Sequence, residues 1–327
     1  MLRLRINVNI KRGVLMVKSE RWGKKYEDKR DWKSYNEELV VRGEFLFELD
    51  WVKNWDNELI EMNAMKRGAA YRFPESLVKL QAVWNQWVDF RGVEGITRKM
   101  QEFALIPEYN DFSTINRRVN KIEAEVTLPQ KGTISVSCDG SGMKMTNRGD
   151  YKETKYGKKK KKFVKVTISA DPIKKKLLAV DVSIEGEGPS EPEVAIFHLE
   201  ELIKRGFDID KFWGDGSFDV NDLFDILDKY NIDSAIKIRR NAIIDPCGSW
   251  RRQREVIKYR KKRYKRWAKE NQYGKRWVGT EGIFSAVKRK FAENTRSRRL
   301  DHLSHEVKRK FWAYDAMSNY AKARVEA

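Results

Sequence analysis

Three acidic residues stand in contexts that suit metal-dependent chemistry. Asp139 and Asp215 each end a β-like run and precede a glycine, in SVSCDGSG and FWGDGSFD, and Glu281 begins a helix-like run in GTEGIFSAVK. A glycine after a carboxylate lets backbone and substrate approach closely. If the three acids converge, they can hold two divalent cations about 3.5–4 Å apart, and such oxygen ligands suit Mg²⁺ or Mn²⁺ better than zinc. Taken singly, each acid could equally be one solvated loop charge among 48 carboxylates.

A lysine shares a helix with the third acid. Glu281, Ser285 and Lys288 fall on one face, because residues four and seven apart are neighbours on a helix. Lys288 then lies roughly 10 Å from Glu281, at a rise of 1.5 Å per residue. That distance suits a contact with a phosphate near a cut bond, whereas the plainer interpretation is a surface lysine.

The elements that must position these residues form two regions behind a basic tail at 1–30. Residues 31–130 are predicted to be all-α, from segments with a period near 3.6 at 32–43, 73–88, 92–106 and 111–125. From 131 to 327 the pattern turns to strands and then to alternating helix and strand. Strands are expected at 133–139, 163–170 and 175–183, with a hairpin turn at Asp171-Pro172, then a helix at 190–205, a strand at 211–215, a helix at 220–230, a strand at 234–238 and helices near 281–292 and 303–323. That order predicts an α/β, RNase H-like domain, a mixed sheet flanked by helices.

The amino-acid composition indicates which kinds of partner the protein binds. The 327 residues favour about two domains, and 68 Lys and Arg against 48 Asp and Glu give a net charge of +20. Such a surplus favours nucleic acid over acidic proteins or anionic membranes. Two cysteines cannot build a zinc cluster or a disulfide scaffold, and no apolar run reaches membrane-spanning length. We therefore expect a cytoplasmic protein without a membrane partner.

One cysteine and two histidines are expected to have no catalytic or metal-binding role. Cys138, next to Asp139, is expected to be a buried strand cysteine rather than a nucleophile. His302 and His305 are expected to face solvent rather than to bind metal.

The acidic motifs resemble those of a known family. CDGSGMK (138–144), GDGSFD (214–219) and E-x6-K (281–288) are similar to the three motifs of DDE transposases from bacterial and archaeal insertion sequences. In the insertion-sequence-five-like group these read D-S-T-G-L-K, A-D-G-A-Y-D and Y-x2-R-x3-E-x6-K. WKSYNEELVVRGEF (32–45) and DFSTINRR (111–118) also resemble that group's W-x2-Y-N-x2-L-x3-G-x-L and D-Y-S-T-x-S-R-R, so the resemblance covers about residues 32 to 320.

The chain departs from the family pattern in two places. The arginine of the third motif falls at Trp277, while Arg276 and Tyr273 lie one place too early. Residues 1–15 lie outside the resemblance, which makes Met16 an alternative translation start.

The resemblance implies an endonuclease and strand-transfer enzyme of DNA transposition. Two Mg²⁺ or Mn²⁺ ions on Asp139, Asp215 and Glu281 would activate water to cut a transposon end, and the freed 3′-hydroxyl would attack target DNA. No covalent protein intermediate and no small-molecule cofactor is implied. The implied partners are double-stranded DNA and a second copy of the chain. The alternatives are an RNase H-like nuclease that cuts without joining, and a transposase-derived DNA-binding regulator, against which the three intact acids count.

Basic segments supply candidate DNA contacts. The stretch 251–270 has 11 Lys and Arg, 2 Glu and interleaved Tyr259, Tyr264 and Trp267, a composition that suits phosphate binding and base stacking. Alternatively it is a charged surface helix whose aromatics face the core. The run at 158–162 could be a DNA contact or a solvated hairpin tip, and the helix at 111–118 resembles the second helix of a helix-turn-helix, although LIPEYND exceeds the usual turn. The candidate contacts are Lys288, Arg117, Arg118, Lys144, Arg239, Arg240, Lys158, Lys159, Lys160, Lys161, Lys162, Lys261, Lys262 and Arg263.

Overall fold

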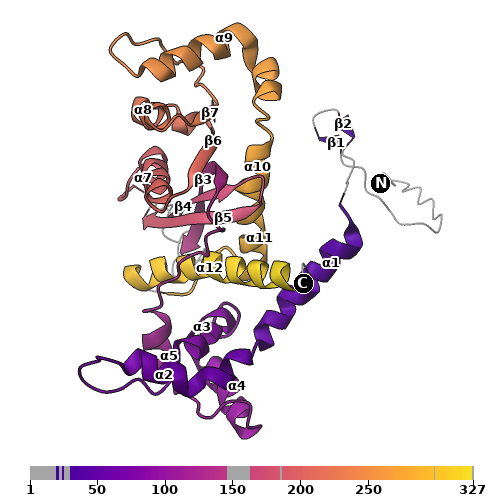
Figure 1. The fold of residues 1–327 in the computed structure, drawn as a ribbon, viewed down its shortest axis with the longest axis vertical. Helices are drawn as coiled ribbons and strands as arrows, with labels where there is room; N and C mark the ends of the chain where they lie inside the picture. The colour runs from indigo at the N-terminus through magenta and orange to yellow at the C-terminus, as the bar shows by residue number, and fades with distance from the viewer. Residues whose placement is uncertain are drawn as a thin grey trace, which may run out of the picture.

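A computed structural model describes residues 30–145, 163–184, 186–297 and 299–325, together with two short paired strands near the N-terminus. These two strands are β1 (Glu20–Arg21) and β2 (Lys24–Lys25). The described chain forms a helical cluster, a mixed sheet with its covering helices, and a basic helix at the far end of the molecule (Figure 1). None of the helices in these ranges is long and apolar enough to cross a membrane.

The helical cluster contains five α-helices and two short 3₁₀ turns. They are α1 (Trp32–Glu44), η1 (Phe45–Phe47), η2 (Asp50–Asn54), α2 (Trp55–Asn63), α3 (Glu75–Trp84), α4 (Phe90–Glu102) and α5 (Phe112–Val119). Asp31, Asp89 and Asp111 cap α1, α4 and α5 by accepting backbone N–H groups. Apolar residues of α3, α4 and α5 pack into one core around Leu77 and Ile115.

The helix expected at 111–125 is shorter than predicted. It ends at Val119, where Asn120 caps it, and the chain continues without helix through residue 125. Ile122 is nonetheless buried in the same core. An apolar residue at helical spacing therefore marks burial here, but not continuation of the helix.

The central sheet has the strand order β5-β4-β3-β6-β7. Its strands are β3 (Thr133–Met145), β4 (Phe163–Asp171), β5 (Lys176–Ile184), β6 (Asp208–Gly214) and β7 (Asp233–Ile236), and β8 (Asn294–Thr295) pairs with the far end of β3. β4 runs antiparallel to β3 and β5, while β6 and β7 run parallel to β3. This order and these directions are those of the RNase H-like fold, as the sequence predicted.

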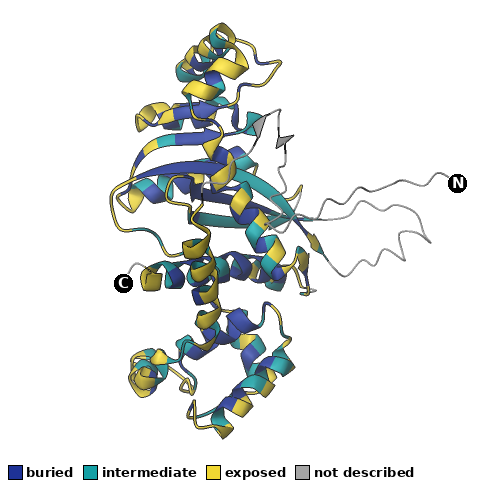
Figure 2. Ribbon diagram, turned by 90° about the vertical axis from the view of Figure 1, so that its right-hand side faces the viewer, coloured by how far each residue is buried: buried dark blue, intermediate teal, exposed yellow. Residues whose placement is uncertain are grey.

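Helices cover both faces of the sheet. On one face α7 (Glu191–Lys204) and α8 (Asn221–Lys229) pack on Ile134, Val136 and Cys138 of β3. On the other face α11 (Glu281–Phe291) and α12 (Leu300–Val325) pack on the valines of β4. The strands and these helix faces are largely buried (Figure 2). Successive side chains of a strand point to opposite faces of the sheet, so each strand contributes to a separate core on each face.

α12 lies between the sheet and the helical cluster (Figure 1). Its Trp312 packs against both the core under β4 and the core of α3 to α5. Arg309, 1% exposed, donates to the carbonyl oxygen of Val119 at 3.2 Å and to Asn120 Oδ1 at 3.1 Å. The last helix of the chain therefore ties the N-terminal helices to the sheet.

Between β7 and α11 the chain forms α9 (Trp250–Glu270) and the short α10 (Lys275–Gly279). α9 bends at Arg263, whose φ of 54° is not helical. Trp267 is buried against Trp213 and Tyr273, while Tyr264 is 48% exposed. The aromatic residues of this stretch thus divide between the core and the surface, and a role of the stretch in DNA binding stays a prediction.

Candidate active site

Asp139 lies just beyond the point at which β3 leaves β6. The last pair between these strands is Ser137 with Trp213, whereas pairing with β4 continues through Lys144. The expectation that Asp139 ends a strand was therefore wrong: β3 runs on to Met145, because β4 still pairs with it. One side of β3 is free of a strand partner at Asp139, and this opening gives the carboxylate access to other elements.

Asp215 directly follows Gly214, the last residue of β6. Its Oδ1 accepts the backbone N–H of Ser217 at 2.7 Å and the Ser217 hydroxyl at 2.5 Å, which caps the 3₁₀ turn η3 (Gly216–Phe218). A side chain at position 214 would lie 2.9 Å from Phe218 Cβ, so glycine allows this tight turn. Because β3 and β6 are adjacent and parallel, Asp139 and Asp215 reach the same edge of the sheet.

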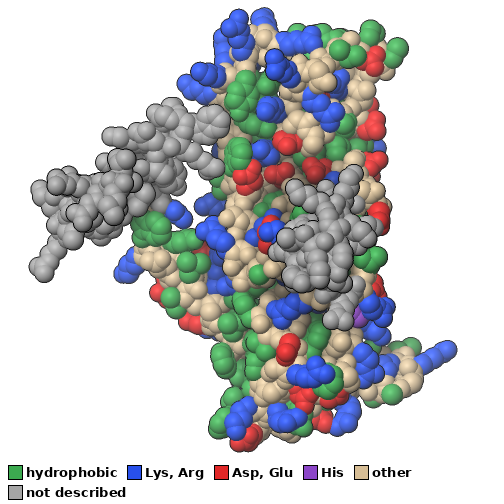
Figure 3. All heavy atoms as spheres, turned by 180° about the vertical axis from the view of Figure 1, so that it is seen from behind, with side chains coloured by type: hydrophobic (Ala, Val, Ile, Leu, Met, Phe, Trp, Pro, Cys, Tyr) green, Lys and Arg blue, Asp and Glu red, His purple; other side chains and the backbone are tan. Residues whose placement is uncertain are grey.

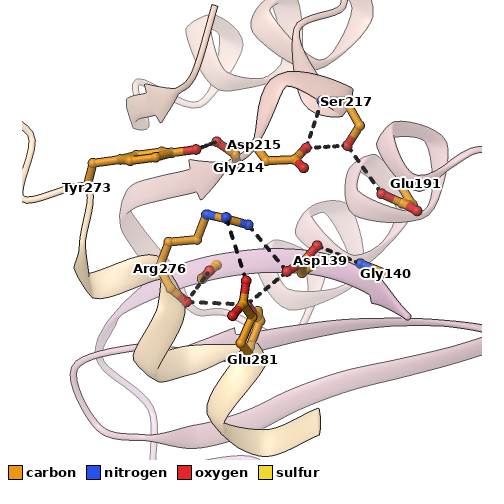
Figure 4. Close-up of polar contacts among 11 residues, drawn as sticks. Asp139, Gly140, Glu191, Gly214, Asp215, Ser217, Tyr273, Arg276 and Glu281 are labelled. Carbon is orange, nitrogen blue, oxygen red and sulfur yellow. Dashed lines mark hydrogen bonds and ion pairs between the residues drawn. The ribbon is translucent and has the colours of Figure 1, made fainter. Parts of the chain in front are cut away.

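Glu281 is the first residue of α11, and it approaches the two aspartates from the face of the sheet that α11 and α12 cover. Arg276 of α10 lies among the acids, with Nη1 3.3 Å from Asp139 Oδ2 and Nη2 4.0 Å from Glu281 Oε1 (Figure 4). The Thr280 hydroxyl donates to the same Asp139 oxygen at 3.4 Å. Acids from β3 and α11 thus flank one guanidinium, and Asp215 at the end of β6 lies close enough to Asp139 to affect its pKa.

The structure also places Tyr273 and Arg276 at this site, although their spacing from Glu281 is one residue off the motif. The Tyr273 hydroxyl donates to the carbonyl oxygen of Gly214 at 3.2 Å, and its ring is buried. The Arg276 guanidinium lies 4.9 Å from the ring centre of Trp277, which is 45% exposed. Trp277 therefore packs against the arginine of the site and is partly open to solvent.

The surroundings of Asp139 shift its pKa. The pKa of Asp139 is raised to about 6, chiefly because the carboxyl is buried and further because Asp215 and Glu191 are nearby; Arg276 and the Gly140 N–H oppose the rise. Burial also raises the pKa of the Cys138 thiol. Cys138 is fully buried in the core under α7, and these two facts agree with its interpretation as a packed strand residue.

The donor set suits a hard divalent cation. Within the described ranges no three His, Cys, Asp or Glu side chains form a ready-made metal centre. The acids are nevertheless all oxygen donors, which suit such a cation, and the Arg276 guanidinium supplies positive charge beside two of them. The Arg276 Nε is buried and has no hydrogen-bond partner. Cation binding that displaced this guanidinium would therefore break few hydrogen bonds.

Lys288 contacts β3 instead of projecting freely from its helix. Its Nζ donates to Ser141 Oγ and to the Gly142 carbonyl oxygen, each at 2.9 Å, and lies 3.0 Å from Glu293 Oε1. Lys144 Nζ lies 2.8 Å from the other oxygen of Glu293. The two lysines of the first and third motifs thus share one carboxylate.

The other predicted DNA contacts are spread over the molecule. Arg239 donates to the carbonyl oxygens of Gly216 and Ser217, at 2.6 and 2.9 Å, and so supports the turn after Asp215. Arg240, Lys261 and Arg263 are exposed, and Lys262 pairs with Glu270. Lys158 to Lys162 lie outside the described residues. Of the described members of this set, Arg239 lies beside the acids, and DNA contact at all of these residues stays a prediction.

Arg117 and Arg118 differ in exposure. Arg117 is exposed on α5 and donates to Thr114 Oγ1 at 3.0 Å. Arg118 is half-buried, lies 4.5 Å from the ring centre of Tyr71, and donates to the Phe73 carbonyl oxygen at 3.3 Å. Burial lowers the pKa of Arg118. Of the two, Arg117 is the more available to a partner.

The two histidines considered above lie on α12. His305 is exposed, as expected, whereas His302 is half-buried.

Sequence reasoning missed one acid. Glu191, the first residue of α7, accepts the Ser217 hydroxyl at 3.2 Å, and Ser217 also contacts Asp215 (Figure 4). Glu191 is in no acidic motif, and it appears in the sequence only as part of the helix start SEPE. The one related feature of the sequence is the glycine at position 140. In the structure a side chain at this position would collide with the Glu191 carboxylate.

Comparison with known families agrees with this geometry. The profile of a family described as transposase DDE domain matches residues 131–315, and a second profile with the same description matches residues 40–148. The first match covers more than half of the chain, so the chain belongs to the DDE transposase family. Among solved structures, the cryo-EM structure of a piggyBac transposase synaptic complex with hairpin DNA matches 88% of this chain and 76% of that chain, with 11% identity and a TM-score of 0.36.

The protein is accordingly a transposase, an enzyme of DNA transposition that cleaves DNA and transfers strands. Enzymes of this family use divalent metal ions in that reaction.

Proposed function

We propose that Asp139, Asp215 and Glu281 bind the two Mg²⁺ or Mn²⁺ ions with which this transposase cuts transposon ends and joins them to target DNA. The observation that carries the proposal is the convergence of these acids at one edge of the sheet, where Arg276 contacts Asp139 and Glu281 and where Asp215 lies near Asp139 (Figure 4). When bound, the cations would activate the attacking water or 3′-hydroxyl and neutralise charge on the phosphate.

The chain's own residues position the acids. Ser217 and Arg239 fix the turn that carries Asp215, through contacts with its carboxylate and with the turn's carbonyl oxygens. Tyr273 holds α10 to the end of β6. With cations bound at the acids, Arg276 would be available to bind a phosphate, for which a guanidinium is well suited.

Charge on the surface supports DNA as the partner. Acidic side chains gather in the middle of the face shown in Figure 3, and Lys and Arg gather at the end formed by α9. We propose that this end and the Arg117 surface of the 31–130 region hold the double-stranded transposon end, while the acids act on its phosphate. Two copies of the chain would pair the two ends, in the cytoplasm.

Replacement of single acids tests the metal assignment. Asp139→Asn, Asp215→Asn and Glu281→Gln should each reduce the rate of Mg²⁺-dependent cleavage by more than about 100-fold. A residue that only hydrogen-bonds to a metal ligand typically costs about 10- to 100-fold when it is changed, so a loss of the ligand itself should exceed that range. The substrate is a duplex with the inverted repeat that flanks the gene. Asp225→Asn, at an exposed residue of α8, is the matched control and should cut normally.

The outcome separates the alternatives. A Glu281→Gln protein that cuts at the parent's rate contradicts the assignment. Ends that are cut by the parent but never joined to a target plasmid would identify a nuclease. A parent that binds the end and cuts nothing would identify a regulator.

A further inference from the structure

Glu191 and Asp215 share one hydroxyl. Ser217 Oγ lies 2.5 Å from Asp215 Oδ1 and 3.2 Å from Glu191 Oε2. A serine hydroxyl has a single proton to donate. It is therefore given mainly to Asp215, the nearer acceptor, and Glu191 Oε2 is left poorly satisfied beside a second carboxylate.

The backbone of β3 makes room for Glu191. A Cβ at position 140 would lie 2.4 Å from Glu191 Oε1 and 2.7 Å from its carboxyl carbon. The glycine after Asp139 thus lets a carboxylate from α7 approach the strand at the catalytic position. The approach brings Glu191 near Asp139 as well as Asp215. Like charges this close disfavour one another, and a bound cation would relieve that repulsion.

The side chain of Glu191 is not part of the cap of α7. The start of α7 is capped by Ser190 and Glu193, which form a reciprocal capping box. Lys165 Nζ lies 3.4 Å from Glu191 Oε1, but both side chains are about one-quarter exposed, and such pairs stabilise a fold only weakly.

We propose that Glu191 is a fourth carboxylate of the metal site and helps Asp139 and Asp215 to hold a divalent cation. The inference rests on the proposed function, since it places Glu191 in the same centre. Glu191 binds from the α7 face of the sheet, while Glu281 binds from the α11 face. The two glutamates would thus enclose the aspartates from opposite sides.

Direct binding of Mn²⁺ to the DNA-free protein tests the proposal. Free Mn²⁺ is measured by electron paramagnetic resonance during titration of the parent and of Glu191→Gln, Glu193→Gln and Asp215→Asn. Glu191→Gln should weaken Mn²⁺ binding by about 10-fold or more. Glu193→Gln removes the same charge from the same helical turn and should bind as the parent does, after thermal unfolding has shown that the variant is folded.

The variants separate the two ideas. If Asp215→Asn weakens Mn²⁺ binding and Glu191→Gln does not, Glu191 is no ligand and the three-acid site stands. If Asp215→Asn binds as the parent does, the three-acid site itself is wrong.

A second variant keeps the glutamate and moves it. Gly140→Ala should displace the Glu191 carboxylate and weaken Mn²⁺ binding by a similar factor. If Glu191→Gln fails to fold, the Gly140→Ala variant tests the proposal in its place. Unchanged Mn²⁺ binding by Gly140→Ala would overturn the proposal.

Discussion

Arg276 and Asp139 form an ion pair, 3.3 Å from Nη1 to Oδ2, that joins α10 to the one stretch of β3 without a β6 partner. The same guanidinium lies 4.0 Å from Glu281. A side chain of the protein thus supplies the positive charge among acids that are proposed to bind metal. A cation and Arg276 are expected to compete for this position.

The first prediction concerns that competition. Arg276→Gln leaves Asp139 without its charged partner in a largely buried site, so the metal-free protein should lose about 1–3 kcal/mol of unfolding free energy. Mn²⁺ should then stabilise the variant more than it stabilises the parent. Urea denaturation with and without Mn²⁺ measures both effects. An equal gain in the two proteins would show that Arg276 and the cation occupy separate places.

The placement of the acids could be predicted only in part. Asp215 follows β6 and Glu281 opens α11, as expected, because a strand that ends in glycine and an amphipathic helix are local patterns. The sequence placed the end of β3 at Asp139, whereas β3 continues to pair with β4 after its pairing with β6 has ended. Which neighbour stops pairing depends on tertiary structure, and a run of β-like residues does not carry that information.

Arg276 and Glu191 escaped prediction for different reasons. The spacing from Arg276 to Glu281 is interrupted, since α10 ends at Gly279 and α11 begins at Glu281, so a motif count does not give their relative direction. Glu191 comes from a helix start 52 residues after Asp139, and it reaches the site only because Gly140 lacks a side chain.

A second prediction follows from Glu293, which binds both Lys144 and Lys288. These contacts lower the pKa of Glu293, so the carboxylate is charged and competes with DNA phosphate for the lysines. Glu293→Gln should therefore tighten duplex binding at low salt by about 3- to 10-fold, as expected when both lysines become available to phosphate.

Lys288→Ala gives the complementary result. It should weaken binding to the transposon end and slow strand transfer, with Mn²⁺ affinity unchanged, while Lys288→Arg should keep part of the activity. Arg289→Ala, at the exposed neighbour on α11, is the matched control for fluorescence anisotropy. Normal end joining by Lys288→Ala at subsaturating DNA would exclude a role in positioning phosphate.

The third prediction separates Arg117 from Arg118. Arg118→Ala removes the packing of the guanidinium on the Tyr71 ring and a hydrogen bond to Phe73, so unfolding free energy should fall by about 1–2 kcal/mol. Arg117→Ala should change it by less than about 0.5 kcal/mol, because the side chain is exposed.

DNA binding should reverse that order. Arg117→Ala should weaken binding to the transposon end by about 1–3 kcal/mol and to random duplex by less, if the arginine contacts a base edge. Anisotropy titrations on both duplexes measure this difference. Equal losses would mean that Arg117 contacts only phosphate.

Salt dependence provides a fourth prediction, on the basic end of α9. Replacing Lys261, Lys262 and Arg263 by Gln should flatten the slope of log K against log salt by about 0.9 for each phosphate that the variant no longer neutralises. Because Lys262 already pairs with Glu270, a change that corresponds to two phosphates rather than three is expected. Gln at Lys204, Arg205 and Lys229, exposed at the ends of α7 and α8, should leave the slope unchanged. A parent-like slope in the α9 variant would show that this end faces solvent.

The last prediction concerns pH and a lysine away from the acids. Lys310 is 3% exposed on α12, and its Nζ donates to the carbonyl oxygens of Ala292 and Asn294 at 3.0 and 2.6 Å. Burial, with Arg296 nearby, lowers the pKa of Lys310 to about 8, although Glu306 opposes the shift. The pKa of an unfolded lysine is about 10.4.

Between these two pKa values the unfolded chain holds more protons than the folded chain does. Stability therefore rises with pH in this window, because unfolding takes up a proton there. Below pH 8 both states are protonated, and burial of the charge costs about 3 kcal/mol at 1.36 kcal/mol per pKa unit. The unfolding free energy of the parent, relative to Lys310→Met, should rise from pH 8 to pH 10 by most of that amount. Lys308→Met, at the half-exposed lysine two residues earlier, should give a flat difference in the same urea titrations. A flat difference for Lys310→Met as well would show that the buried ammonium keeps its proton as readily as a lysine in the unfolded chain.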